Sequence, residues 1–125
     1  MRGVSFWFFF TATIYVSLGM IWGIEMSISE DHTLAPVHAH LNLIGWVTMA
    51  LFGLYYHLVP ASADTGLARF HFVVATSGLL LIVPGIVLAI TERGELLAKV
   101  GSILTLISML TFVYTVARNR DSSPR

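Results

Sequence analysis

Four long apolar runs constrain this chain more than any other feature of its sequence. They cover residues 6–28, 38–59, 67–90 and 96–117, and only short polar stretches connect them. An α-helix needs about 20 apolar residues to cross the hydrocarbon core of a bilayer. We therefore predict an all-α fold, an integral membrane four-helix bundle that forms a single domain over residues 1–125.

Composition agrees with a membrane protein and excludes several other classes. Hydrophobic residues make up 56% of the chain and charged residues 11%, too few for the surface of a soluble domain. The seven basic and seven acidic residues balance, so nothing favours nucleic acid as a partner. The absence of cysteine excludes disulfides, thiolate-bound metals and covalent heme attachment. The first run is too long for the apolar region of a signal peptide and no small-residue cleavage motif follows it, so we expect it to remain a helix.

The basic residues predict the orientation, because cytoplasmic segments of membrane proteins carry more Lys and Arg than external ones. With both termini inside, the inner side holds five basic residues, namely Arg2, Arg69, Arg118, Arg120 and Arg125. The outer side then holds only Arg93 and Lys99. We expect an N-in, C-in protein of the bacterial inner membrane with multiple spans, whose first partner is the lipid bilayer.

Three histidines in the second apolar run are the candidate chemistry, because ionisable residues inside membranes usually have a function. His38 and His40 stand two residues apart, so on an α-helix they point about 200° apart and reach different sides. His57 follows 17 residues after His40, about 25 Å along an α-helix. One metal ion or heme cannot use both His40 and His57, so we distinguish an outer layer of side chains from an inner one.

Two segments carry a resemblance to a known family. "HAHLNLIGWVTMALFGLYYHLVP" and "GLARFHFVVATSGLLLIVPGIVLA" resemble the tenth and eleventh helices of heme-copper oxidase subunit I and nitric oxide reductase. The first segment opens with His-x-His, and the second matches a basic-x-His-Phe element at Arg69, His71 and Phe72. The second also has a glycine at Gly78 and a proline at Pro84, which we expect to kink its helix. The close resemblance covers about 55 residues, while the other two runs match the family only in length and hydropathy.

The resemblance implies heme b as the cofactor. The family's first histidine of the pair binds the high-spin heme and the second binds the low-spin heme, so His38 and His40 are expected to do the same. Arg93 lies in the loop where the family places basic partners of the heme propionates. The family's copper-ligating helices, its cross-linked tyrosine and the second ligand of its low-spin heme are absent, so a complete oxygen-reducing site is not expected in one copy.

The family core has approximate threefold symmetry in units of four helices, and this chain resembles one unit. We therefore favour a homo-oligomer, a trimer that mimics the twelve-helix core and holds heme between subunits. Four glycines would allow close contact of helices, either between subunits or within one chain, and they are Gly19, Gly23, Gly45 and Gly53. Such a protein would serve electron transfer or oxidoreductase chemistry on O2 or NO, with an electron donor or a larger oxidase complex as partner.

Two alternatives remain at this stage. The outer layer of Glu25, His32, His38 and His40 suits copper or zinc in a heme-free binding or transport module. The chain is alternatively an accessory subunit of a larger oxidase. The inner-layer histidines, His57 and His71, are expected at the membrane interface with their polar atoms in water, and a shared metal ion is the weaker interpretation.

Overall fold

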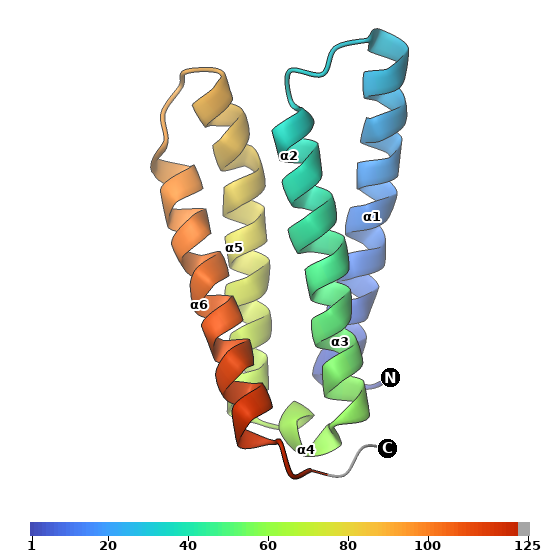
Figure 1. Ribbon diagram of the computed structural model, residues 1–125, viewed down its shortest axis with the longest axis vertical. Helices are drawn as coiled ribbons and strands as arrows, with labels where there is room; N and C mark the ends of the chain where they lie inside the picture. Colours follow the sequence, from blue (N-terminus) through green and yellow to red (C-terminus); the bar gives the residue numbers. More distant parts are fainter. Residues whose placement is uncertain (123–125) are drawn as a thin grey trace.

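The computed structural model describes residues 1–122, and all regular secondary structure in that range is helical. The elements are α1 (Gly3–Ser29), α2 (Ala35–His40), the π-helix η1 (Leu41–Thr48), α3 (Met49–Leu58), α4 (Pro60–Ala63), α5 (Gly66–Ile90) and α6 (Leu96–Arg118). Because α2, η1 and α3 follow one another without a break, they form one long helix (Figure 1). The four long helices predicted from the sequence are therefore present, with bounds within three residues of those expected.

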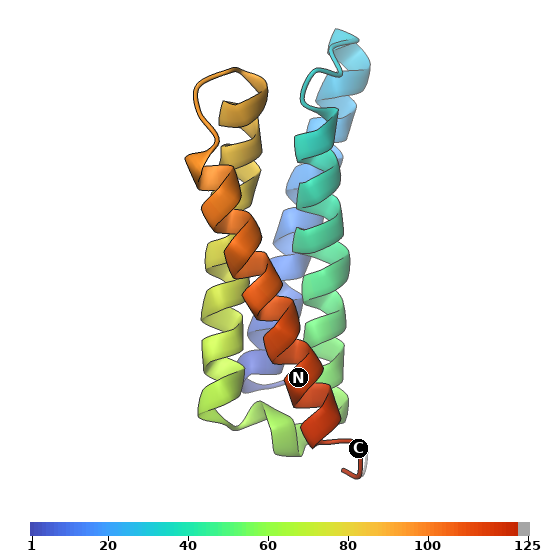
Figure 2. The same cartoon turned by 60° about the vertical axis from the view of Figure 1, so that its left-hand side comes forward.

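The long helices form two hairpins that stand side by side. The first pairs α1 with the α2–η1–α3 helix and the second pairs α5 with α6, and most helix contacts are made within a hairpin. The start of α1 and the end of α6 lie at one end of the bundle, the terminal end (Figures 1 and 2). The α1–α2 and α5–α6 connections lie at the other, the loop end.

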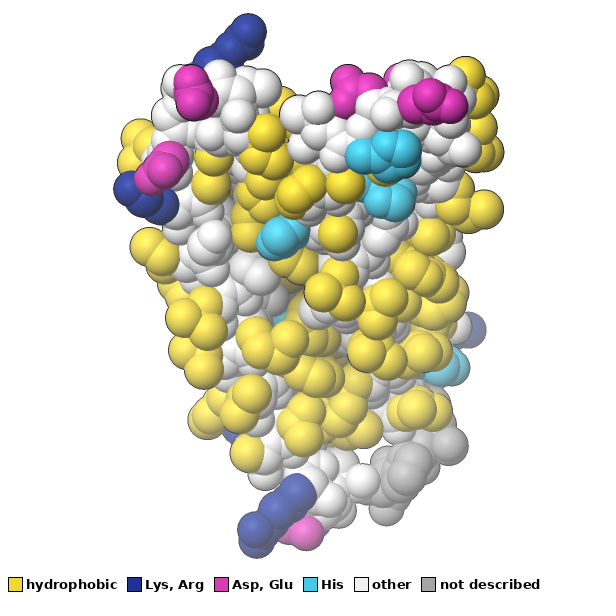
Figure 3. All heavy atoms as spheres, turned by 45° about the horizontal axis from the view of Figure 1, so that its top comes forward, with side chains coloured by type: hydrophobic (Ala, Val, Ile, Leu, Met, Phe, Trp, Pro, Cys, Tyr) yellow, Lys and Arg dark blue, Asp and Glu magenta, His cyan; other side chains and the backbone are white. Residues whose placement is uncertain are grey.

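The surface has the pattern of a membrane-spanning bundle. All four long helices are long and apolar enough to cross a membrane. Hydrophobic side chains cover the middle of the face shown in Figure 3, and charged side chains lie towards its two ends. Since most of each helix is left uncovered by the chain itself, these apolar faces are available to lipid or to another subunit.

Local signals in the sequence explain where the helices begin and end. Glu30 ends α1 in the left-handed conformation, and Pro36 stands in the first turn of α2, where its missing N–H is not needed. The Thr65 side chain accepts a 3.1 Å hydrogen bond from the Ala68 amide and caps α5. Pro84 lies inside α5, which continues through it as one helix to Ile90.

The π-helix was not predicted from the sequence, and Asn42 explains part of it. The Asn42 side-chain amide donates a 2.8 Å hydrogen bond to the His38 carbonyl, the acceptor that the Asn42 backbone N–H would use in an α-helix. Farther along, the Thr48 hydroxyl donates to the Leu43 carbonyl, five residues back, at 2.9 Å. Side chains that compete for backbone carbonyls loosen the regular helical ladder. π-Helical turns are rare and occur often at functional sites.

Glycines bring the helices of each hairpin close together. A Cβ atom on Gly101 of α6 would lie 2.5 Å from the Ile82 amide nitrogen of α5. In the first hairpin, a Cβ on Gly53 would lie 2.9 Å from the Phe9 amide nitrogen. Likewise, Gly19 packs against Asn42.

The glycines proposed for contact between helices therefore pack within one chain. Gly23 meets the His38 ring, and Gly45 meets Tyr15 and Leu79. Of the two interpretations left open by the sequence, the structure favours packing within the chain, so these glycines lend no support to a trimer.

Candidate functional site

His40 makes its side-chain hydrogen bond within its own helix. Its Nδ1 lies 2.7 Å from the Pro36 carbonyl oxygen one turn earlier. Because a carbonyl only accepts, Nδ1 must carry the proton, and Nε2 keeps its lone pair in the neutral ring. The ring is partly exposed at the loop end of the second helix. Histidines that bind metals usually donate their second N–H to such a carbonyl, which fixes the orientation of the ring.

His38 is directed into its own hairpin. Its Nε2 lies 2.9 Å from the Gly19 carbonyl oxygen of α1 and therefore donates to it. The Trp22 ring packs edge-on against it, with ring centroids 6.2 Å apart. A Cβ at Gly23 would lie 3.2 Å from Nε2, so the glycine makes room for the ring. The two histidines thus have different surroundings, because His38 bonds to α1 whereas His40 bonds to its own helix.

The other candidate residues, Glu25 and His32 of the expected outer layer and Arg93, are exposed. Glu25 lies near the loop end of α1 and Arg93 in the α5–α6 connection, both exposed. His32 is exposed in the loop before α2, where its Nδ1 lies 3.2 Å from the Glu30 carbonyl oxygen. Figure 3 shows histidine side chains gathered near the end that carries the acidic loop residues.

No group of three His, Cys, Asp or Glu side chains lies close enough to hold a metal ion within residues 1–122. The outer layer of one chain is therefore not a preformed copper or zinc site.

The loop between α1 and α2 is fixed by its own polar groups. The Thr33 hydroxyl and amide donate to Asp31 Oδ1 at 2.7 and 3.0 Å. These two hydrogen bonds stabilise the carboxylate and lower the pKa of Asp31 below its ordinary value.

His71 is not at the membrane interface, contrary to the sequence prediction. Its side chain is 0% exposed and lies at the centre of the aromatic core. Nδ1 lies 2.9 Å from the Tyr56 hydroxyl, and Nε2 lies 3.1 Å from the Ser108 hydroxyl. The rings of Phe8, Phe52 and Phe112 surround it at centroid distances of 5.0, 4.5 and 5.9 Å.

This arrangement gives His71 a structural role. Both ring nitrogens already have partners, so neither is free for a metal ion shared with His57. The Tyr56 hydrogen bond joins α5 to α3 and so links the two hairpins, whereas the Ser108 hydrogen bond joins α5 to α6 within the second hairpin. His57, the penultimate residue of α3, is partly buried, and its buried Nδ1 has no partner among the described residues.

Sequence reasoning missed Tyr56, Ser108 and Asn42 as partners of the histidines. The sequence did contain a signal for the position of His71. Small residues stand three positions before it, four positions after it and seven positions after it, and all three share its helical face. These are Ala68, Ala75 and Gly78, and all are buried. A polar residue on a face of small residues faces a neighbouring helix rather than water.

Comparisons with known proteins found no matching family model, no matching curated protein and no matching solved structure.

Proposed function

We propose that this chain is a membrane b-type heme protein in which His40 is the iron ligand and heme lies between copies of the chain. The observation that carries the proposal is the partly exposed His40 ring, whose Nδ1 is held by the Pro36 carbonyl, which leaves the Nε2 lone pair without a hydrogen-bond partner among the described residues. That state of the ring is the one a heme ligand requires. The resemblance of the His38–His40 segment to the heme-copper oxidase and nitric oxide reductase family points to the same role.

The surface beside His40 suits a porphyrin. Leu43, Val47 and Leu51 follow it along the same helix and are 62%, 43% and 56% exposed. An apolar macrocycle would lie against such side chains, which one chain leaves uncovered. A second copy would then cover the other face of the heme and supply the second axial position, and a trimer would repeat this contact at each interface.

Two further residues fit the proposal in part. Arg93 lies at the loop end, as His40 does, so its guanidinium is available to a heme propionate (Figure 1). The Nε2 of His38, the expected ligand of a second heme, is held by the Gly19 carbonyl, which leaves for iron only Nδ1, the ring nitrogen nearer its own backbone. We therefore assign iron ligation to His40 first.

Bound heme supplies one-electron chemistry, and the chain supplies the ligand, the apolar surroundings and the orientation. Two axial histidines favour electron transfer, whereas an open position favours chemistry on a small gas such as O2 or NO. Carbon monoxide distinguishes these, because only an open ferrous site shifts its Soret band. In the orientation proposed from the basic residues, with both termini in the cytoplasm of a bacterial cell, the heme lies near the external surface.

The competing proposals are a heme-free copper or zinc module and an accessory subunit of an oxidase. The metal module would use Glu25, His32, His38 and His40 from more than one chain. Metal analysis of the purified protein, beside heme quantification, separates these proposals.

The test is a heme titration of the purified protein in mild detergent, with His40→Ala compared against His32→Ala. His32 is the matched control because it is an exposed histidine at the same end of the bundle. We expect His40→Ala to lower the amount of bound heme at least ten-fold and His32→Ala to leave it unchanged. Equal heme binding by wild type and His40→Ala would show that His40 is not the ligand.

A further inference from the structure

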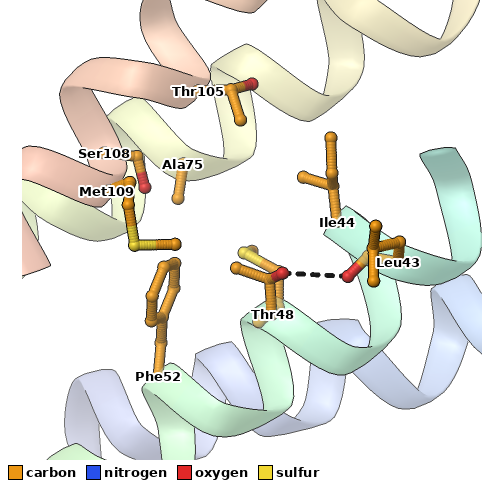
Figure 4. A pocket seen from close by; sticks show the side chains of 9 residues that line it. Leu43, Ile44, Thr48, Phe52, Ala75, Thr105, Ser108 and Met109 are labelled. Atoms are coloured by element: carbon orange, nitrogen blue, oxygen red, sulfur yellow. Dashed lines mark hydrogen bonds between the residues drawn. The ribbon is translucent and has the colours of Figure 1, made fainter.

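A cavity of about 130 Å³ lies between the two hairpins, away from the histidine pair. Side chains from η1, α3, α5 and α6 surround it (Figure 4). Its lining residues that matter here are Leu43, Thr48, Ala75, Thr105, Ser108 and Met109.

The cavity lies near the middle of the membrane-spanning segments. Thr48 is close to the midpoint of the Ala35–Leu58 span, and Ala75 is near the middle of Gly66–Ile90. Ser108 is likewise central in Leu96–Arg118. Its nearest surroundings outside the chain are therefore acyl chains rather than water.

The cavity follows from the local structure of its walls. On one side the wall is η1, whose last residue, Thr48, bonds back to the Leu43 carbonyl (Figure 4). On the opposite side Ala75 contributes only a methyl group. The larger side chains of Phe52 and Met109 line the space without filling it.

The polar atoms around the cavity already have partners. The Thr48 hydroxyl donates to the Leu43 carbonyl at 2.9 Å, and the Thr105 hydroxyl donates to the Gly101 carbonyl at 2.8 Å. The Ser108 hydroxyl lies 3.1 Å from His71 Nε2. A buried water needs about two to four polar partners, so this space favours an apolar occupant.

We propose that this cavity binds small, uncharged, apolar molecules of the size of xenon or a diatomic gas, which enter from the acyl-chain region. The volume is comparable to the engineered apolar cavity of roughly 150 Å³ that stays dry and binds xenon or benzene. Leu43 and Met109 form the entrance, since they are 62% and 41% exposed while lining the cavity. The inference goes beyond heme binding, with which it shares one residue, Leu43 of the surface proposed for the porphyrin.

Xenon is the probe, because its anomalous scattering locates it in crystals. We expect crystals of the purified wild-type protein, grown in a lipid mesophase and pressurised with xenon, to show an anomalous peak inside the cavity. Ala75→Leu fills the space and is expected to abolish the peak. Val73→Leu is the control, because Val73 is on the same helix but 61% exposed, and it should keep the peak.

A second variant keeps the test decisive if Ala75→Leu fails to fold. Met109→Trp closes the entrance from an exposed position and should also remove the peak. Absence of a peak in the wild type would overturn the proposal, as would an acyl chain or ordered water in the cavity. A peak that persists in both Ala75→Leu and Met109→Trp would overturn it as well.

Discussion

The buried hydrogen bond between Tyr56 and His71 allows a quantitative test of how the two hairpins are joined. Tyr56→Phe removes one interhelical hydrogen bond and leaves His71 Nδ1 without its partner at 2.9 Å. Interhelical hydrogen bonds in membrane proteins contribute about 0.6 kcal/mol on average and up to about 1.7 kcal/mol. An unpartnered buried polar group costs about 1–3 kcal/mol. We therefore expect Tyr56→Phe to lower the free energy of unfolding by about 1–2 kcal/mol.

His71→Leu should cost more, because it leaves two hydroxyls buried without that partner, those of Tyr56 and Ser108. We expect a loss of about 2–4 kcal/mol. In the His71→Leu background, Tyr56→Phe removes a hydroxyl that no longer has this acceptor, so the second substitution should cost almost nothing. The coupling free energy of the pair is then about 1–2 kcal/mol.

The assay is equilibrium unfolding of the detergent-solubilised protein by SDS, followed by tryptophan fluorescence. Tyr55→Phe is the matched control, since Tyr55 is the neighbouring tyrosine, is only partly buried and is not bonded to His71. It should shift the unfolding midpoint little in either background. If Tyr56→Phe costs the same with and without His71, the coupling is zero and the proposed link between the hairpins is refuted.

Three further predictions concern packing, the loop and topology. Gly101→Ala places a Cβ 2.5 Å from the Ile82 amide nitrogen, so it should destabilise the bundle by about 1–3 kcal/mol in the same SDS assay. Thr33→Val should raise the pKa of Asp31 towards its ordinary value, which an NMR titration measures. In the wild type, the hydrogen bonds to Asp31 stabilise the loop fully at pH values above the pKa of the unfolded carboxyl. This stabilisation is lost as the pH falls through the lowered pKa of the folded state. Because the chain has no cysteine, a single introduced cysteine reports on which side of the membrane it lies. Asp31→Cys should react with an impermeant maleimide in intact cells, and Ser122→Cys only after permeabilisation. The reverse result would contradict the N-in, C-in orientation.

The long helices were predictable because the membrane simplifies the reading of a sequence. A run of apolar residues between polar turns must form a helix in the bilayer, because its backbone groups cannot bond to water there. The helix bounds followed within a few residues. Arg125, which was counted in the charge bias, lies outside the residues described.

The directions of side chains were harder to predict, because they depend on which helix lies next to which. Helical periodicity indicated that His38 and His40 point apart, yet it did not show that α1 would take up the Nε2 of His38. His71 was misplaced because its distance from the helix start suggests the interface, while its helical face puts it in the core.

The π-helix could not be predicted in part because Asn42, one of the two side chains that bond to its backbone, has an unusual position for an asparagine. Asparagine often lies on an exposed or capping position, but Asn42 fits between Gly19 and the His38 carbonyl. Its hydrogen bond to that carbonyl competes with the backbone. The sequence alone does not show that Gly19 makes room for the Asn42 side chain, because this depends on how α1 packs against the second helix.

Native mass spectrometry of the wild-type protein, purified in mild detergent from heme-supplemented membranes, tests the central proposal most directly. One spectrum reports both the number of chains and the number of hemes. The account predicts an oligomer, with a trimer favoured, that carries heme and loses it in His40→Ala. A heme-free monomer in the wild type, or an oligomer whose heme survives His40→Ala, would contradict it.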